Sequence, residues 1–292
     1  MQLFASDLLT RALIGALVIG VAAPTLGIYL VQRRMSLIGD GIGHVALTGV
    51  GIGLLFDKPP VLAAVVVAAL GGICVELVRE HGRSSGDLAL AMLFYGGIAG
   101  GVMLVRVSGG TNNNLMQYLF GSLSTISPGD LYVLVGLGFA VVATMLLLRP
   151  ALFAVCHDEE YARVSGLPVR LLNLVLAVTT AVTVTIAMQT VGLLLVSALM
   201  VVPVAAAQQV TRGFRSTMHV AMGIGLLAAG LGVWLANTAD TAPGATIVVL
   251  AIATFVALTV GAATWRLLRR RNARASGQAA APLEPPDVAL QH

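Results

Sequence analysis

Residues 33–47 read RRMSLIGDGIGHVAL, and the chain then stays apolar as far as Phe56. Two ionisable residues, Asp40 and His44, therefore stand one helical turn apart in a stretch suited to crossing a membrane. A charged side chain at the centre of a bilayer costs roughly 3 kcal/mol, so such residues are retained chiefly for a function. Positions i and i+4 project from one helix face. A carboxylate and an imidazole on one face supply half of a divalent-metal site.

The arginines at the start of this stretch indicate how deep the pair lies. If Arg34 marks the inner membrane boundary, a rise of about 1.5 Å per residue places Asp40 about 9 Å and His44 about 15 Å beyond it. His44 is then expected near the midplane and Asp40 in the inner half. Metal binding would require a neutral His44 and an ionised Asp40. The alternative is a structural hydrogen bond between helices.

The composition of the whole chain predicts a membrane protein. Of its 292 residues, 58% are hydrophobic and 10% are charged, whereas soluble domains contain about 25% charged residues. Long apolar stretches with short polar breaks predict an all-α fold, a polytopic bundle of transmembrane helices. About nine spans of roughly 20 residues are expected. They lie near residues 8–31, 36–55, 60–78, 87–107, 130–148, 171–188, 192–210, 217–236 and 244–264.

The basic residues predict the orientation of these spans. With the N-terminus outside, nearly all of the 17 Lys and Arg residues fall in inside loops, and the exceptions are Arg11, Lys58 and Arg106. The first span is expected to be retained, because a second span follows without a small-residue cleavage site. The arginine-rich run after Trp265 then predicts an anchor at the cytoplasmic membrane lipid, with no role in binding nucleic acid.

Two regions of different composition follow from this pattern. Residues 1–271 are expected to form one transmembrane domain. Residues 272–292 have too few apolar side chains to fold and are expected to form a disordered cytoplasmic tail. The two cysteines, Cys74 and Cys156, form neither a disulfide framework nor a CxxC metal motif.

Glycines at four-residue spacing, such as Gly97 and Gly101, predict close packing between helices. Glu76 is expected to pair with Arg79 at the inner end of its span. Three further polar residues could line a path or serve helix packing, and they are Gln189, Ser197 and Gln208.

Two ligands are too few for a metal, and Asp240 is the best further candidate among the acidic residues. It lies at the outer end of the last span, whereas His44 is expected at mid-depth. The two could share one ion only if the chain around Asp240 enters the membrane as a broken helix that lines a cavity. Alternatively, Asp240 caps the last span, with Pro243 in its first turn.

The sequence contains no nucleotide-binding motif, so any pumping would draw its energy from another chain or from an ion gradient. One alternative is therefore a secondary metal/proton transporter that uses Asp40 and His44 as an intramembrane relay. Genes for an ATPase and a metal-binding lipoprotein beside this one would argue against it. A second alternative, an intramembrane metalloenzyme, would need a closer ligand set such as HExxH, which the sequence lacks.

Four segments together resemble the ABC-3 family of metal permeases, the membrane subunits of bacterial zinc and manganese importers. They occur in the family's order, and the resemblance covers roughly residues 10–264. The segments are RRMSLIGD with His44 (residues 33–44), NLMQYLFGS (114–122), GLLLVSALMVVPVAAA (192–207) and DTAPG (240–244). The last departs from relatives that place proline directly after the threonine.

The resemblance implies a transport subunit of the bacterial cell membrane, not an enzyme, with no permanently bound cofactor. Two copies would form the translocation path as a homodimer, two cytoplasmic ATPase subunits would dock on inside loops, and an extracellular metal-binding protein would deliver the ion. Asp40, His44 and Asp240 match the family's metal path. In the connection at residues 150–170, Glu160, Ala162 and Gly166 resemble the family's ATPase contact. A plain solvated connector is the alternative for that segment.

The sequence predicts the permease subunit of an importer for a divalent transition metal. It leaves zinc or manganese open, because imidazole suits zinc whereas carboxylate and water oxygens suit manganese.

Overall fold

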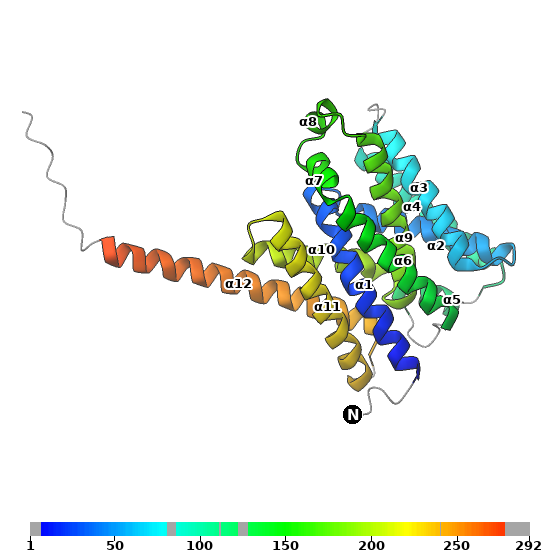
Figure 1. Cartoon of the computed structure of the whole chain (residues 1–292). Helices are drawn as coiled ribbons and strands as arrows, with labels where there is room; N and C mark the ends of the chain where they lie inside the picture. Colours follow the sequence, from blue (N-terminus) through cyan, green and yellow to red (C-terminus); the bar gives the residue numbers. More distant parts are fainter. Residues whose placement is uncertain (1–6, 81–85, 111, 122–127, 240, 278–292) are drawn as a thin grey trace, which may run out of the picture.

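The computed structural model describes residues 7–80, 86–110, 112–121, 128–239 and 241–277, and within them all regular structure is helical (Figure 1). The helices are α1 (Asp7–Gln32), α2 (Ile38–Leu55), α3 (Pro60–Glu80), α4 (Gly86–Val107), α5 (Asn112–Phe120), α6 (Pro128–Leu147), α7 (Arg149–His157), α8 (Glu159–Val164), α9 (Val169–Thr190), α10 (Leu193–Val210), α11 (Phe214–Ala239) and α12 (Pro243–Gly277).

Eight helices in the described part of the chain are long and apolar enough to cross a membrane, and they are α1, α2, α3, α4, α6, α9, α11 and α12. They correspond to eight of the nine predicted stretches. The remaining stretch, residues 192–210, forms α10, whose apolar length is shorter. The predicted all-α membrane bundle is confirmed. The count of nine spans and the orientation of the termini stay predictions.

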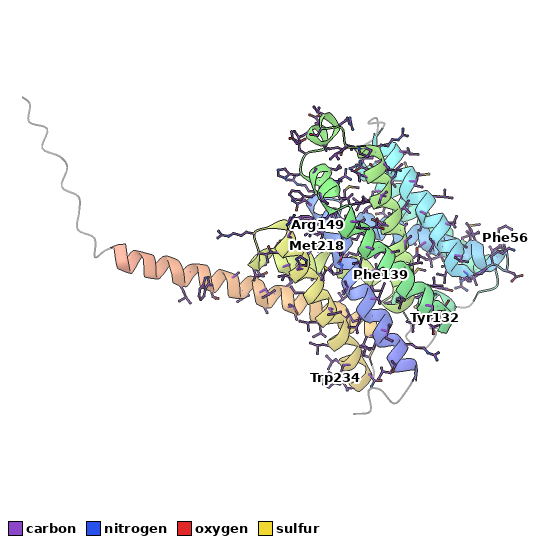
Figure 2. All side chains as sticks on the ribbon, viewed as in Figure 1. Phe56, Tyr132, Phe139, Arg149, Met218 and Trp234 are labelled. Carbon is purple, nitrogen blue, oxygen red and sulfur yellow. The ribbon has the colours of Figure 1, made fainter. Side chains whose placement is uncertain are left out.

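The bundle has a buried centre and an apolar outside. In the spanning windows of α1, α2 and α9, 72%, 67% and 67% of residues are buried, against 17% in α4 and in α12. Large side chains such as Phe56, Tyr132 and Phe139 are exposed on the surface (Figure 2). Helices apolar on all sides are expected where lipid or another helix covers them.

The centre contains polar side chains whose hydrogen bonds are made locally. On α9, the hydroxyl groups of Thr180, Thr183 and Thr185 each donate to the carbonyl oxygen four residues earlier, at 2.6–2.8 Å. Such bonds let a hydroxyl lie in an apolar interior without an unpaired donor.

Helices α2 and α4 pack closely, as the glycine spacing predicts. A side chain at Gly97 would collide with the backbone of His44 and Val45, and the Thr48 hydroxyl donates to the Gly97 carbonyl at 2.8 Å. Gly96, one residue earlier, faces open space. The contact therefore uses one face of α4, and that face holds the backbone of His44 in place.

Helix α12 extends away from the bundle and ends at Gly277 (Figure 1). It is therefore still helical over the first residues of the predicted tail, 272–277. The rest of that segment, 278–292, lies outside the described residues, and the division at residue 271 stays a prediction.

Candidate metal-handling site

The predicted pair lies in the first two turns of α2. Asp40 is in the first turn, where the N-terminal end of the helix dipole favours a negative charge. Leu37 precedes the helix and provides no side-chain cap. His44 follows one turn later and is only 3% exposed. The structure thus places a carboxylate and an imidazole together near the start of a buried helix.

A backbone hydrogen bond fixes which nitrogen of His44 can face a ligand. His44 Nδ1 lies 2.7 Å from the carbonyl oxygen of Asp40, which can only accept, so Nδ1 carries the proton and donates. In the neutral form of the ring, this arrangement leaves the lone pair on Nε2. Metal-binding histidines are commonly held this way, with the second nitrogen donating to an oxygen.

The Asp40 carboxylate has a partner 157 residues away in sequence. Its Oδ1 accepts a hydrogen bond from the hydroxyl of Ser197 on α10. Ser197 is one of the residues that the sequence suggested as lining a path, and the structure brings it to the carboxylate. This bond aims one carboxylate oxygen toward α10.

Asp40 also faces a pocket of about 350 Å³ between α2 and α4. The other lining residues are Leu37, Leu90, Ala91, Phe94 and Tyr95. The ring of Phe94 lies with its centroid 4.3 Å from that of His44. An apolar wall around a few polar groups is typical of a ligand site. No signal in the sequence distinguished Phe94 from its apolar neighbours.

Asp240 lies outside the described residues, so its distance from the pair is not defined. Within the described residues, no group of three or more His, Cys, Asp or Glu side chains lies close enough to hold a metal ion. On either side of Asp240, α11 ends at Ala239 and α12 begins at Pro243. The predicted third ligand stays a prediction.

The four segments that carry the family resemblance meet in space through small residues. Gly39 and Gly43 of α2 approach Ser197, Met200 and Leu193 of α10. The residue that joins α9 to α10, Gly192, has a φ of +93° and lies against the backbone of Phe120 at the end of α5. These contacts connect α2 to α10 and the start of α10 to α5.

The start of α12 joins the same region. Gly244 packs against the carbonyl group of Val191 and the side chain of Leu195. Leu193 in turn contacts Gly43, the residue before His44, so the start of α12 is connected to α2 through the start of α10.

The residues predicted to contact an ATPase lie on and after the short helix α8. Asp158 caps α8, since its Oδ1 accepts from the backbone N–H of Tyr161 at 2.9 Å. Glu160 is exposed, whereas Ala162 is fully buried. Gly166 follows the helix with a φ of +81°, which explains the glycine; its N–H donates to the Arg163 carbonyl, and the N–H of Leu167 donates to the Ala162 carbonyl. Contact with an ATPase stays a prediction.

The predicted pair of Glu76 and Arg79 is confirmed, with Arg79 Nη2 lying 2.8 Å from Glu76 Oε1. Gln189 lies elsewhere, in a second pocket of about 390 Å³ with Gln117, Tyr118 and Asp130. Burial raises the pKa of Tyr118, and the nearby Asp130 adds to this effect. Gln208 is exposed.

A helical bundle with spanning helices and a polar pair inside it defines a multi-pass membrane protein of the kind that moves solutes. The chain matches the ABC 3 transport family over residues 5–262. It therefore belongs to this family, whose members include metal transport permeases, and it is a multi-pass protein of the bacterial cell membrane.

Relatives and solved structures agree with this assignment. The manganese transport system membrane protein MntC of Halalkalibacterium halodurans is 30% identical, over 87% of this chain and 87% of that protein. The high-affinity zinc uptake system membrane protein ZnuB of Haemophilus influenzae is 29% identical, over 86% and 96%. PsaBC from Streptococcus pneumoniae, solved with a Fab, is 27% identical with a TM-score of 0.80, over 88% and 92%.

Proposed function

We propose that this chain is the permease subunit of an ATP-driven importer that carries a divalent transition metal, zinc or manganese, into the cytoplasm. The observation that carries the proposal is the pair of a partly exposed Asp40 and a buried His44, one turn apart at the start of α2, with Asp40 facing a pocket. The relatives named for manganese and zinc transport support the same cargo.

The geometry of the pair suits an ion that passes rather than stays. His44 would offer the Nε2 lone pair, and Asp40 would offer a carboxylate that only Ser197 engages among the described contacts. Nitrogen and oxygen donors together accept both zinc and manganese. An incomplete ligand set lets the ion leave again, which transport requires. We infer that Asp240 completes the set, because its described neighbours approach the start of α10.

The same proposal implies that further protein subunits assemble with this one. A second copy would cover the α2–α4 face and close the pocket beside Asp40, which gives a homodimeric path. Cytoplasmic ATPase subunits would dock at α8, where Glu160 is exposed. An extracellular metal-binding protein would deliver the ion to the opposite end. The distribution of arginines supports this orientation, because nearly all of them lie in the proposed inside loops.

Replacing the imidazole tests the proposal. In vesicles containing the permease, its ATPase and its metal-binding protein, His44→Ala should lower ATP-dependent uptake of Mn²⁺ and of Zn²⁺ by roughly tenfold or more, because a metal ligand is lost. The control is His219→Ala, since His219 is exposed on α11 and lies outside the proposed site and the 150–170 connection. Normal uptake by the His44 variant would refute the site, and uptake driven by a proton gradient without ATP would favour a secondary transporter.

A further inference from the structure

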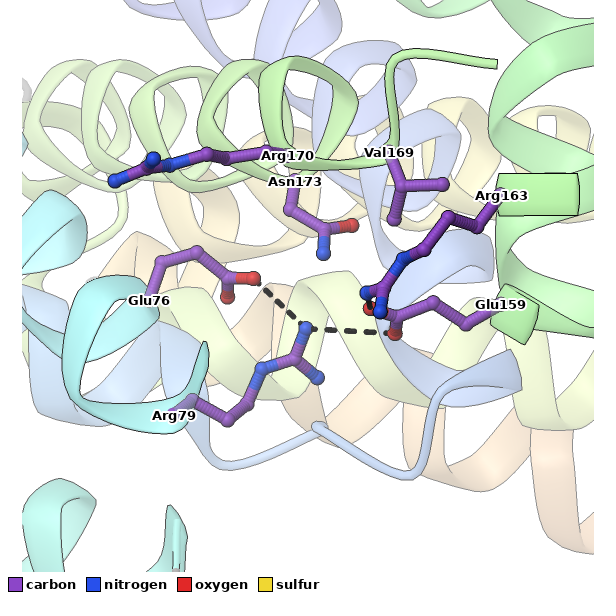
Figure 3. A pocket seen from close by; sticks show the side chains of 7 residues that line it. All are labelled: Glu76, Arg79, Glu159, Arg163, Val169, Arg170 and Asn173. Carbon is purple, nitrogen blue, oxygen red and sulfur yellow. Dashed lines mark hydrogen bonds and ion pairs between the residues drawn. The ribbon is translucent and has the colours of Figure 1, made fainter. Parts of the chain in front are cut away.

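An ionic cluster joins four parts of the chain at the end of the bundle near α8 (Figure 3). Its residues are Arg33, Glu76, Arg79, Glu159, Arg163 and Asn173, and all but Arg33 line a pocket of about 260 Å³. They come from the α1–α2 connection, α3, α8 and α9. The cluster lies outside the candidate metal-handling site.

Glu159, the first residue of α8, is the centre of this cluster. Its Oε2 lies 2.9 Å from Arg33 Nη2 and 3.8 Å from Arg79 Nη2, and its Oε1 lies 3.6 Å from Arg163 Nη2. Figure 3 shows Arg79 between the carboxylates of Glu76 and Glu159. The next residue, Glu160, is exposed instead. Two adjacent glutamates of one short helix thus face in different directions, one into the bundle and one outward.

Arg33 connects Glu159 to the segment that precedes Asp40 and His44. Its side chain is only 6% exposed, and its Nη1 also donates to Asn173 Oδ1 at 2.7 Å. Arg33 belongs to the five-residue connection between α1 and α2. Charge-assisted hydrogen bonds to Glu159 and Asn173 thus hold the enclosed guanidinium group of Arg33.

Hydrogen bonds connect this segment to the helices on both sides of it and to Arg79. The N–H of Met35 donates to the Leu30 carbonyl at 2.8 Å, and the N–H of Ile38 donates to the Met35 carbonyl at 3.1 Å. Arg79 Nη1 also donates to Met35 Sδ at 3.5 Å. Ile38 starts α2, and Asp40 follows two residues later.

We propose that Glu159 is a positioning residue that transmits movement of α8, through Arg33 and Arg79, to the start of α2 and so to Asp40 and His44. This inference rests on the proposed function, because it assigns the origin of the movement to an ATPase docked at α8. Glu160 then provides contact outside the subunit, and Glu159 provides the connection inside it. The described contacts give Glu159 a direct ion pair with the segment that leads into α2.

The test separates transport from ATP hydrolysis. In the vesicles described above, uptake of Mn²⁺ and of Zn²⁺ and the hydrolysis of ATP are measured together. Glu159→Ala should still assemble with the ATPase and hydrolyse ATP. The number of ions moved per ATP should fall about tenfold, the order expected for loss of a charge-assisted hydrogen bond. Glu159→Gln keeps an acceptor of the same length and should restore part of this ratio.

Arg212→Ala is the control, because Arg212 is an exposed arginine in the connection between α10 and α11 and lies outside both α8 and the ionic cluster. It should leave the ratio unchanged. Glu160→Ala should instead weaken co-purification of the ATPase. The double variant Arg33→Ala with Glu159→Ala should lower the ratio by less than the two single effects combined, because both substitutions remove the Arg33–Glu159 contact.

The outcomes distinguish the two proposals. A wild-type ratio in Glu159→Ala, or independent additive effects of the two substitutions, would overturn the inference while the proposed function stands. If Glu159→Ala does not fold, a wild-type ratio in Glu159→Gln overturns it equally. Wild-type vesicles without ATP-dependent metal uptake would overturn the proposed function itself.

Discussion

Two polar clusters lie in this bundle, and they differ in how fully their charges are paired. In the cluster around Glu159, every described carboxylate faces an arginine within 2.8–3.8 Å. At the metal-handling pair, Asp40 is engaged by the neutral hydroxyl of Ser197 and His44 by a backbone carbonyl. Neither of these partners carries a positive charge. A cation is therefore the expected partner of the metal-handling pair, whereas the cluster around Glu159 already contains its own cations, the arginines.

This difference shows that burial of a polar side chain does not by itself identify a ligand-binding site. Glu76 and His44 are both largely buried, at 5% and 3% exposed. Glu76 is matched by Arg79 of the same helix and so contributes to structure. A charge within a membrane-spanning helix is costly, so the Asp40 carboxylate, which has no cationic partner among the described contacts, points to a transient one.

The difference between the two clusters is tested most directly by neutralising one carboxylate in each of them. Asp40→Asn should lower metal uptake roughly tenfold or more while thermal stability is maintained, because the lost charge serves the ion. Glu76→Gln should instead lower the free energy of unfolding by about 1.5–3 kcal/mol, because Arg79 loses a charge-assisted partner. Uptake assays and thermal unfolding in detergent measure the two effects.

The opposite pattern would contradict the assignment of the clusters. A destabilised Asp40→Asn with normal uptake would make the pair structural. A stable Glu76→Gln that loses uptake would place Glu76 on the ion path.

A smaller effect is expected at the contact that holds the pair in place. Gly97→Ala would push a methyl group into the backbone of His44 and should cost about 1–3 kcal/mol of stability with a partial loss of uptake. Gly96→Ala is the matched control, because Gly96 faces open space and alanine favours the helix by up to about 1 kcal/mol. Equal behaviour of the two variants would show that the α2–α4 contact does not position His44.

The smallest expected effect is a shift in the pH at which the Cys156 thiol reacts, which reports on the charges of the ionic cluster. Burial raises the pKa of the Cys156 thiol to about 11, Arg33 acts against this rise and Glu159 adds to it. In a Cys74→Ala background, alkylation of Cys156 should increase as the pH approaches 11, because only the thiolate reacts. Glu159→Gln should move the profile to lower pH, and Arg33→Gln should move it to higher pH.

Alkylation of Cys156 at an ordinary thiol's pH would show that the helix end around α7 is open to water. A profile that neither substitution moves would show that the charges of the cluster do not surround Cys156.

The sequence determined more of the fold than of the site. Eight predicted spans formed helices, because apolar stretches of membrane length need no partner segment to be recognised. The division at residue 271 stays a prediction, and α12 continues past it to Gly277. A helix can continue beyond its apolar stretch where the following residues tolerate helical structure. Hydrophobicity in the sequence marks only the apolar part of such a helix.

For the site, the spacing of Asp40 and His44 placed both on α2, because helical periodicity is local. Ser197 was one of several polar candidates in the sequence, and Phe94 was not distinguishable from other apolar residues. Glu159 was not singled out at all, while its neighbours Glu160 and Ala162 were. Nothing in a local pattern shows which of two adjacent glutamates faces inward.

The sequence by itself determined the membrane class, the helices and the local pairs, since each follows from hydrophobicity and periodicity within one segment. Only the tertiary structure decided which distant segments meet. It brought Ser197 to Asp40, Phe94 to His44, and Glu159 to Arg33. The physical reason is that these contacts depend on how helices pack across long sequence separations, and that packing is set by the shape of all the helices together.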